Sequence, residues 1–363
     1  MYDLSEEPVE SAGPLPSGGT PFSLKAAAAA IPRECYDNPT WRGLAIFARD
    51  WAIYLAAVAL LLWSNSPAVL IPAWLIAGLT ISGLFVIGHD AAHGALFRSA
   101  RLNYWIGQLS MLPSLHAFDV WAYGHNRVHH AFAACEGMDF VWHPATLGQY
   151  ERLSPLGKLL HRVEWSMLGS GIYYARAMWW GRILNAEPPE RLRAAFRRDR
   201  CLIALYALGT SAAVGAAGYA LTGHGLGAWW CWAKVLLVPW LIWNYAIGTT
   251  VYVHHIAPQI VWHPRRRWSK FAGQVESTGS VRIARWLNFF WHNIYVHTPH
   301  HVDPRIPFYH LPAAAASLAR SYPDLVSIRS YHLHDYVRTT RHCKLYDFER
   351  GVWLDYDGVE AAA

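Results

Sequence analysis

Four long apolar runs, arranged in two pairs, dominate the pattern of hydrophobic and polar positions along the chain. They cover residues 44–64, 68–88, 202–222 and 228–253. Each run is close to the roughly 20 apolar residues that a helix needs to cross the hydrocarbon core of a bilayer. The linkers inside the pairs, around Ser64–Pro67 and Gly223–Gly227, are short. The pattern therefore predicts four transmembrane helices in two hairpins.

Lys and Arg are absent from these two linkers and concentrate in the N-terminal region, in residues 89–200 and in the C-terminal segment. Cytoplasmic loops carry an excess of such residues, so both termini and the long middle segment are expected in the cytosol. We therefore predict an all-α, multi-pass integral membrane protein of the inner (cytoplasmic) membrane, with a cytosolic helical cap. Residues 1–40 are expected to be a flexible cytosolic segment, and residues 41–363 a single membrane domain.

The composition agrees with a membrane location. Apolar residues make up 53% of the chain and charged residues only 15%, against about a quarter charged in soluble domains. The net charge of +6 comes from Lys and Arg scattered between the apolar runs, without a nucleic-acid motif, so nucleic acid is not an expected partner. The five Cys form no CxxC pair, which argues against a thiol-based site.

Eight histidines gather in three tight clusters at or just beyond apolar runs. They are His89 and His93 in HDAAH, His125, His129 and His130 in HNRVHH, and His297, His300 and His301 in HTPHH. A single HxxxH pair is common by chance, but three such clusters on the same predicted side of the membrane favour one shared metal centre. A non-enzymatic metal or haem transporter is a weaker alternative, because the middle of each apolar run contains no histidine.

Helical spacing suggests how the clusters share metal ions. The two histidines of the first cluster are four residues apart and project from one helix face. In the second cluster His125 and His129 are expected to share a face, with His130 rotated by about 100°. In the third cluster, His297 is expected to face His300 and His301, three and four residues further along the helix. A catalytic zinc uses only three protein ligands, so eight imidazoles predict two ions, and two redox-active irons suit O₂ chemistry on a lipid hydrocarbon.

With these residues in view, the chain resembles the membrane fatty acid desaturases, and within them the acyl-lipid omega-6 (Δ12-like) branch. The resemblance runs from about residue 40 to the end. It rests on GHDAAHGALF (88–97), WAYGHNRVHHAFAACEGMDFVWHP (121–144), VYVHHIAP (251–258), WHNIYVHTPHH (291–301) and the tail CKLYDFERGVWLDYDG (343–358). It implies four membrane spans under a cap in which two irons are held by histidines.

The resemblance also implies an activity, in which two irons and O₂ introduce a cis double bond into a lipid-borne or free fatty acyl chain. No catalytic residue is implied beyond the metal ligands. The implied ligands are the eight clustered histidines and His255, with His254 as the alternative. His292, Asp90, Glu136 and Asp139 are candidates for further ligands or for groups that orient the ligand histidines.

Some residues depart from the usual family pattern. Ala91 and Ala92 stand where plant-type members commonly have Cys-Gly, and three residues instead of two precede His129 and His130. The alternative activities are therefore those of related di-iron oxidases, such as a terminal-alkene-forming fatty-acid decarboxylase, a hydroxylase or a ketolase. The sequence has no HPGG haem-binding motif, so electrons are expected from a separate donor, ferredoxin or a cytochrome-like protein.

Overall fold

The computed structural model describes residues 22–326 and 328–361. Residues 1–40 are expected to be a flexible segment, and residues 1–21 of this segment lie outside the described residues. Its remaining part forms helix α1 (Leu24–Ala29) and the 3-10 helix η1 (Arg33–Tyr36). Ala27 and Cys35 in these elements are buried, so this part of the chain packs against the rest of the molecule.

Four helices are long and apolar enough to cross a membrane, as the sequence predicts. They are α2 (Thr40–Trp63), α3 (Pro67–Ala92), α10 (Arg193–Thr222, preceded by the 3-10 turn η4, Glu190–Leu192) and the continuous helix made of α11 (Gly225–Trp232), η5 (Ala233–Leu237) and α12 (Val238–His255). All four extend beyond the predicted apolar runs at one end or both. Helix α3 continues to Ala92, so the first histidine cluster begins inside the helix and not after it.

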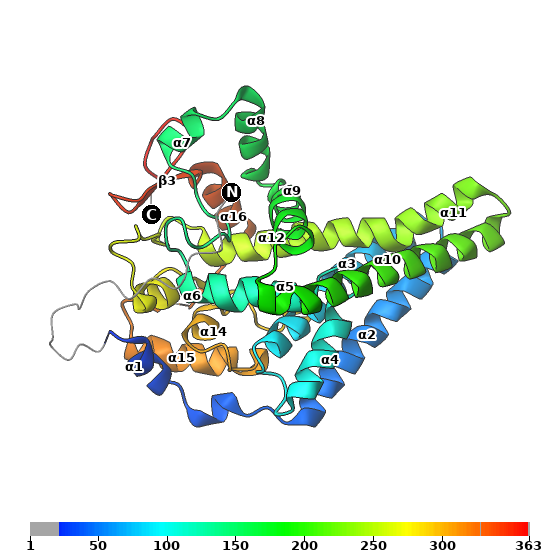
Figure 1. The fold of residues 1–363 in the computed structure, drawn as a ribbon, viewed down its shortest axis with the longest axis horizontal. Helices are drawn as coiled ribbons and strands as arrows, with labels where there is room; N and C mark the ends of the chain where they lie inside the picture. The colour runs from blue at the N-terminus through cyan, green and yellow to red at the C-terminus, as the bar shows by residue number, and fades with distance from the viewer. Residues whose placement is uncertain (1–21, 327, 362–363) are drawn as a thin grey trace.

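Helix α3 lies at the centre of this group. It packs along α2 on one side and along α12 on another, while α10 packs along α11 (Figure 1). In its most apolar stretch 67% of the residues are buried, against 22% in α2 and 11% in the helix that contains α10. The outer helices therefore turn most of their apolar side chains away from the protein, as expected for helices in contact with lipid.

Shorter helices fill the space between and beyond the long ones. Those between the two helix pairs are α4 (Ala100–Met111), α5 (Phe118–Tyr123), η2 (Gly124–His129), α6 (His130–Phe132), α7 (Leu147–Glu151), α8 (Pro155–Glu164), α9 (Ser170–Tyr173) and η3 (Tyr174–Leu184). Those after α12 are η6 (Ala272–Glu276), α13 (Arg285–Trp291), α14 (Thr298–Val302), η7 (Phe308–His310), α15 (Leu311–Ser321) and α16 (Leu333–His342). In Figure 1 most of them gather at the left end of the molecule, opposite the joined tips of α10 and α11.

Two small sheets accompany these helices, so the expectation of a purely helical fold is wrong in this detail. Strand β1 (Ser280–Arg282) pairs in parallel with β2 (Ile328–Ser330), and β3 (Leu345–Asp347) pairs antiparallel with β4 (Val352–Leu354). Each strand has three residues, which is too short to show the alternating pattern by which a strand is recognised in a sequence. The fold of the described residues is otherwise helical.

Candidate metal centre

Nine histidines from four separate parts of the chain converge into two adjacent groups. The first, group A, contains His89, His93, His125, His130 and His300. The second, group B, contains His129, His255, His297 and His301. Within each group the candidate ligand nitrogens all lie within 4.8 Å of one another. The two groups together contain the eight clustered histidines and His255.

Group A joins the C-terminal end of α3 to the turn η2–α6 and to α14. The Nε2 atoms of His89 and His125 are 3.1 Å apart, those of His125 and His130 are 3.1 Å apart, and those of His130 and His300 are 3.0 Å apart. The rings of His93 and His300 meet edge to face, with their centroids 4.8 Å apart. Residues more than 200 positions apart in the sequence thus contribute to the same small polyhedron of nitrogens.

Group B lies directly beside group A. The Nε2 atoms of His297 and His301 are 2.9 Å apart, and the rings of His129 and His255 meet edge to face at 4.7 Å. His129 and His130 are neighbours in the chain but belong to different groups, and the same holds for His300 and His301. Each adjacent pair therefore supplies one imidazole to each group, which links the two sites rigidly.

The second cluster differs from the expected α-helical arrangement. Residues Gly124–His129 form a π-helix, and the backbone N–H of His130 donates to the carbonyl of His125, five residues earlier. This wider turn places His125 and His130 in the same group and sends His129 into the other one. The expectation that His125 and His129 share a face while His130 is rotated away is therefore wrong, because it assumed 3.6 residues per turn.

The chemistry of these donors suits a transition metal. Imidazole nitrogen binds Zn²⁺ at about 2.0–2.1 Å, so two nitrogens on one ion at right angles lie about 3 Å apart, close to the Nε2 separations described above. Burial, and then the neighbouring imidazoles, lower the pKa of His125, His130 and His300 well below the usual range, and the same causes act on His297 and His301. Neutral rings with free lone pairs are the form that binds metal ions.

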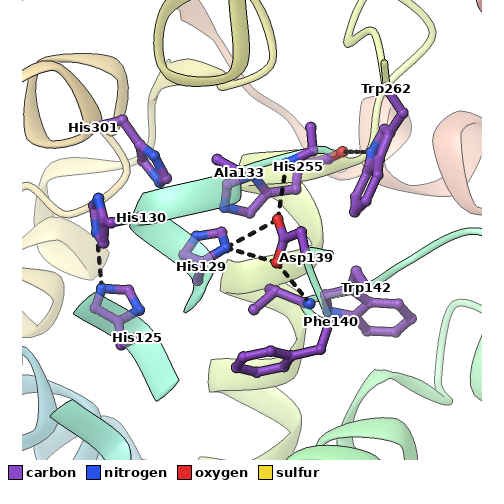
Figure 2. A network of polar contacts seen from close by, with 12 residues as sticks. His125, His129, His130, Ala133, Asp139, Phe140, Trp142, His255, Trp262 and His301 are labelled. Carbon is purple, nitrogen blue, oxygen red and sulfur yellow. Dashed lines mark hydrogen bonds and ion pairs between the residues drawn. The ribbon is translucent and has the colours of Figure 1, made fainter. Parts of the chain in front are cut away.

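Buried carboxylates fix the orientation of two of these rings. Asp139 accepts from Nδ1 of His129 at 3.0 Å, as Figure 2 shows, and it also accepts from the backbone N–H groups of Ala134 and Val141. Burial alone would raise the pKa of Asp139, but the charge and hydrogen bond of His129 outweigh it and lower the pKa. Asp90 accepts from Nδ1 of His89 at 2.9 Å. With Nδ1 protonated, Nε2 of each ring is left free for an ion.

Gln274, in η6, has the same role and was missed by the sequence analysis. Its Oε1 accepts from Nδ1 of His301 at 2.7 Å, and its Nε2 donates to the carbonyl of His130 at 2.7 Å. The side chain is buried and connects one residue of each group. No signal in the sequence points to it, because it is a single glutamine outside every histidine cluster.

Three other candidates lie outside the two groups. His254 stacks on the ring of His297 with centroids 3.8 Å apart. His292 contacts Asp50 of α2, with Nε2 2.6 Å from the carboxylate, and stacks on Phe308. Glu136 makes no hydrogen bond or ion pair with a grouped histidine among the described residues; its backbone N–H donates to the carbonyl of His263. Of the two histidines that end α12, His255 is therefore the one that lies in group B.

An apolar cavity opens onto both groups. Its histidine wall includes His89, His125 and His129. The other walls come mainly from α3, α12 and η3. They are formed by Phe85, Val86, Tyr174, Met178, Ile247, Val251 and Ile294. An acyl chain in this cavity would lie between apolar side chains, with one part of its length against the imidazoles.

Comparison with known proteins agrees with this geometry. Residues 65–332 match the sequence model of the fatty acid desaturase family. The chain belongs to this family. A fatty acid desaturase is an oxidoreductase that introduces a double bond into an acyl chain, and this is the activity of the protein. The expected membrane desaturase activity is therefore confirmed, as are the four apolar helices that suit a membrane protein.

Among the relatives of this desaturase, the chloroplastic omega-6 fatty acid desaturase of Glycine max is 28% identical over 347 residues, which cover 92% of the chain and 77% of the relative. The sn-1 oleoyl-lipid 12-desaturases of Picosynechococcus sp. and Synechocystis sp. are 28% and 25% identical, each covering 88% of both chains. These relatives confirm the resemblance to the acyl-lipid omega-6 branch.

Proposed function

We propose that this desaturase uses two iron ions and O₂ to introduce a cis double bond at position 12 of an oleoyl chain carried by a membrane lipid. The observation that carries the proposal is the apolar cavity with imidazoles of both groups in its wall. The relatives from Picosynechococcus sp. and Synechocystis sp. are oleoyl-lipid 12-desaturases, which supports the substrate and the position.

Each histidine group holds one iron in this proposal. One ion is bound by group A and the other by group B, with His255 and not His254 completing the second set. Support comes from the short Nε2 separations and from the neutral state of the buried rings, since a metal must otherwise compete with protons for its ligands. The bound irons supply the activation of O₂ and the removal of two hydrogens from neighbouring methylene groups.

The remaining tasks belong to the protein. The walls formed by Phe85, Val86 and Ile247 exclude water and hold the acyl chain in one position against the imidazoles. Asp90, Asp139 and Gln274 hold the ligand rings in one orientation, so that the ions keep their places while the substrate binds. No side chain is required as a general base.

The proposed topology has two transmembrane hairpins, α2–α3 and α10–α12, under a cap that carries the metal centre. Both termini and the cap lie in the cytosol, and the membrane is the inner (cytoplasmic) one. The absence of Lys and Arg from the two hairpin turns supports this orientation. Electrons come from a separate carrier, a ferredoxin or a cytochrome-like protein.

The test is expression of the protein in a host without polyunsaturated lipids. Gas chromatography of the lipid acyl chains is expected to show a 9,12-diunsaturated product. His129→Ala and His300→Ala remove one ligand from each group and are expected to lower the iron content from two per chain and abolish the product. His292→Gln, which changes a buried histidine outside both groups, should retain two irons.

Other outcomes would contradict the proposal. A volatile terminal alkene one carbon shorter than its fatty acid would instead assign a decarboxylase, and a hydroxylated or keto product would assign one of the other related oxidases. Full activity with two irons in His129→Ala or His300→Ala would overturn the assignment of ligands.

A further inference from the structure

A strongly basic loop lies next to the metal centre on the surface of the cap. Residues 263–270, here called the basic loop, contain the exposed Arg265, Arg266, Arg267 and Lys270. Glu349 pairs with both Arg266 and Arg267. Arg265 and Lys270 have no ion-pair partner among the described residues. Four cations within six positions, with one carboxylate shared between two of them, leave the loop with an excess of positive charge.

The basic loop is fastened to the segment that follows the second histidine cluster. His263 exchanges backbone hydrogen bonds with this segment, donating to Ala134 and accepting from Glu136, both at 2.9 Å. The indole N–H of Trp268 donates to the carbonyl of Ala133 at 2.9 Å, three residues after His130 of group A. The backbone of the metal site therefore lies directly beneath the loop.

The chain then leads from the loop to the metal ligands themselves. Gly273 packs so closely that a Cβ there would lie 2.6 Å from both the Ala133 carbonyl oxygen and the Trp268 Nε1, which only glycine allows. Gln274 follows and contacts both His301 and the His130 carbonyl. The half-buried Trp268 at the surface is thus connected to both histidine groups through its hydrogen bond to Ala133 and through the short chain segment that leads to Gln274.

The reaction requires electrons that the described residues do not supply. Conversion of a –CH₂–CH₂– unit to –CH=CH– with reduction of O₂ to two waters consumes two electrons and two protons from outside: two C–H bonds and the O–O bond break, and a C=C π bond and four O–H bonds form. A one-electron carrier must therefore deliver an electron twice per turnover. The rate of electron transfer falls steeply with distance, so the carrier has to bind close to the metal centre.

On these grounds we infer that the basic loop is the docking surface for a small, acidic, one-electron carrier protein. The inference rests on the proposed function, since it names the partner that reduces the same centre. The charge of the loop suits an acidic partner, because complementary charges raise the association rate between proteins. The loop contacts the segment that follows the second histidine cluster, so a carrier bound to the loop would lie close to the centre that it reduces.

The test compares two variants with the same change in charge. Arg265→Glu with Lys270→Glu reverses the two unpaired cations of the basic loop. Arg193→Glu with Arg197→Glu reverses two exposed cations at the start of α10, outside the loop. Binding of an acidic [2Fe–2S] ferredoxin to each protein in nanodiscs is titrated at 20 and 200 mM KCl, with the iron-loaded and the metal-stripped enzyme.

Wild type and the α10 variant are expected to bind the ferredoxin more weakly at the higher salt concentration. The loop variant is expected to bind at least tenfold more weakly at 20 mM KCl and to lose most of this salt dependence. Its ferredoxin-driven product formation should fall in parallel, while its iron content and its product formation with dithionite as reductant stay at wild-type levels.

Ferredoxin binding that is unchanged in the loop variant would overturn the inference. So would a loop variant that retains ferredoxin binding but loses binding to phosphatidylglycerol vesicles, since this would assign the cations to lipid headgroups. Failure of the proposed function looks different: wild type would form no diunsaturated product with dithionite, while the binding titrations would still decide the role of the loop.

Discussion

A histidine that binds a metal through one ring nitrogen needs a partner for the other nitrogen, and three residues serve this purpose here. Asp90 and Asp139 are carboxylates that accept from His89 and His129. Gln274 is neutral and accepts from His301 while donating to the backbone beside group A. Gln274 therefore contacts one residue of each group, and replacing it tests whether a side chain outside the ligands supports metal binding.

We expect Gln274→Leu to weaken metal binding in group B by about 10- to 100-fold, the usual effect of removing such a partner. The imidazole of His301 then loses the acceptor that fixes its tautomer. Iron content after dialysis against graded chelator concentrations measures this, and the variant should retain about one iron per chain where wild type retains two.

Gln108→Leu is the matched control for this prediction. Gln108 is also a buried glutamine, but it contacts Tyr104 and Asp199 and no grouped histidine. It should lose thermal stability, because Asp199 loses a buried hydrogen bond, without losing iron. Equal iron retention in the two variants would contradict the role given to Gln274.

The histidine clusters and Gln274 mark the limits of inference from sequence at this scale. The eight clustered histidines were predictable because their repetition is improbable by chance, and Asp90 and Asp139 because they lie beside or close to a cluster. Gln274 lies more than twenty residues from the nearest third-cluster histidine, and only folding brings its side chain to His301. A hydrogen-bond partner supplied by another part of the chain leaves no local pattern.

At the scale of elements, the π-turn η2 explains how a histidine cluster with an additional residue still supplies both groups. An insertion of one residue into an α-helix is commonly accommodated as a π-bulge. Here the wider turn pairs His125 with His130 across five positions. In a cluster with only two intervening residues, the corresponding histidines would be four positions apart and would share a face of an ordinary α-helix. The departure from the family pattern is thus compensated by backbone geometry.

Deleting the exposed Arg127 should therefore convert η2 to an α-helix and keep the pairing of the first and last histidines of the cluster. We expect the deletion variant to retain two irons per chain and activity within several-fold of wild type. Insertion of one alanine after Arg127 should instead rotate His129 and His130 away from their groups and lower the iron content to one or none. Iron analysis and product formation in both variants measure this.

If the deletion loses iron as completely as the insertion, the π-turn is required for another reason and this explanation is wrong.

The π-turn itself could not be predicted, because periodicity arguments assume 3.6 residues per turn and a single cluster is too short to reveal a different period. The long helices were predicted well for the opposite reason: each offers some twenty consecutive apolar residues, and only their ends differ from expectation.

At the scale of the whole molecule, folding gathers nine imidazoles into one buried volume. Burial lowers the pKa of His125, His130, His297, His300 and His301 below the usual value near 6.5. An unfolded chain takes up protons at these rings as the pH falls through 6.5, whereas the folded chain does so only at lower pH. The unfolded state therefore binds more protons in this window, and acid destabilises the metal-free fold.

We expect the thermal unfolding midpoint of the metal-stripped protein in detergent to decrease as the pH is lowered from 7.5 to 5.5. Each ring contributes up to roughly 1.4 kcal/mol per pH unit below 6.5. His300→Gln removes one titrating group and should show a shallower decline than wild type. A midpoint that does not change over this range, or an identical decline in the variant, would contradict the prediction.

The division of the ligands along the chain also bears on how the enzyme is made. Group A draws four of its histidines from the first 130 residues, whereas group B has only His129 from that part and needs His255, His297 and His301 from later in the chain. During synthesis, one pocket is therefore nearly complete long before the other exists. If each group holds one iron, as proposed, iron delivered early would occupy half a centre, and the second ion would bind only after the last long helix has been inserted and α14 has left the ribosome.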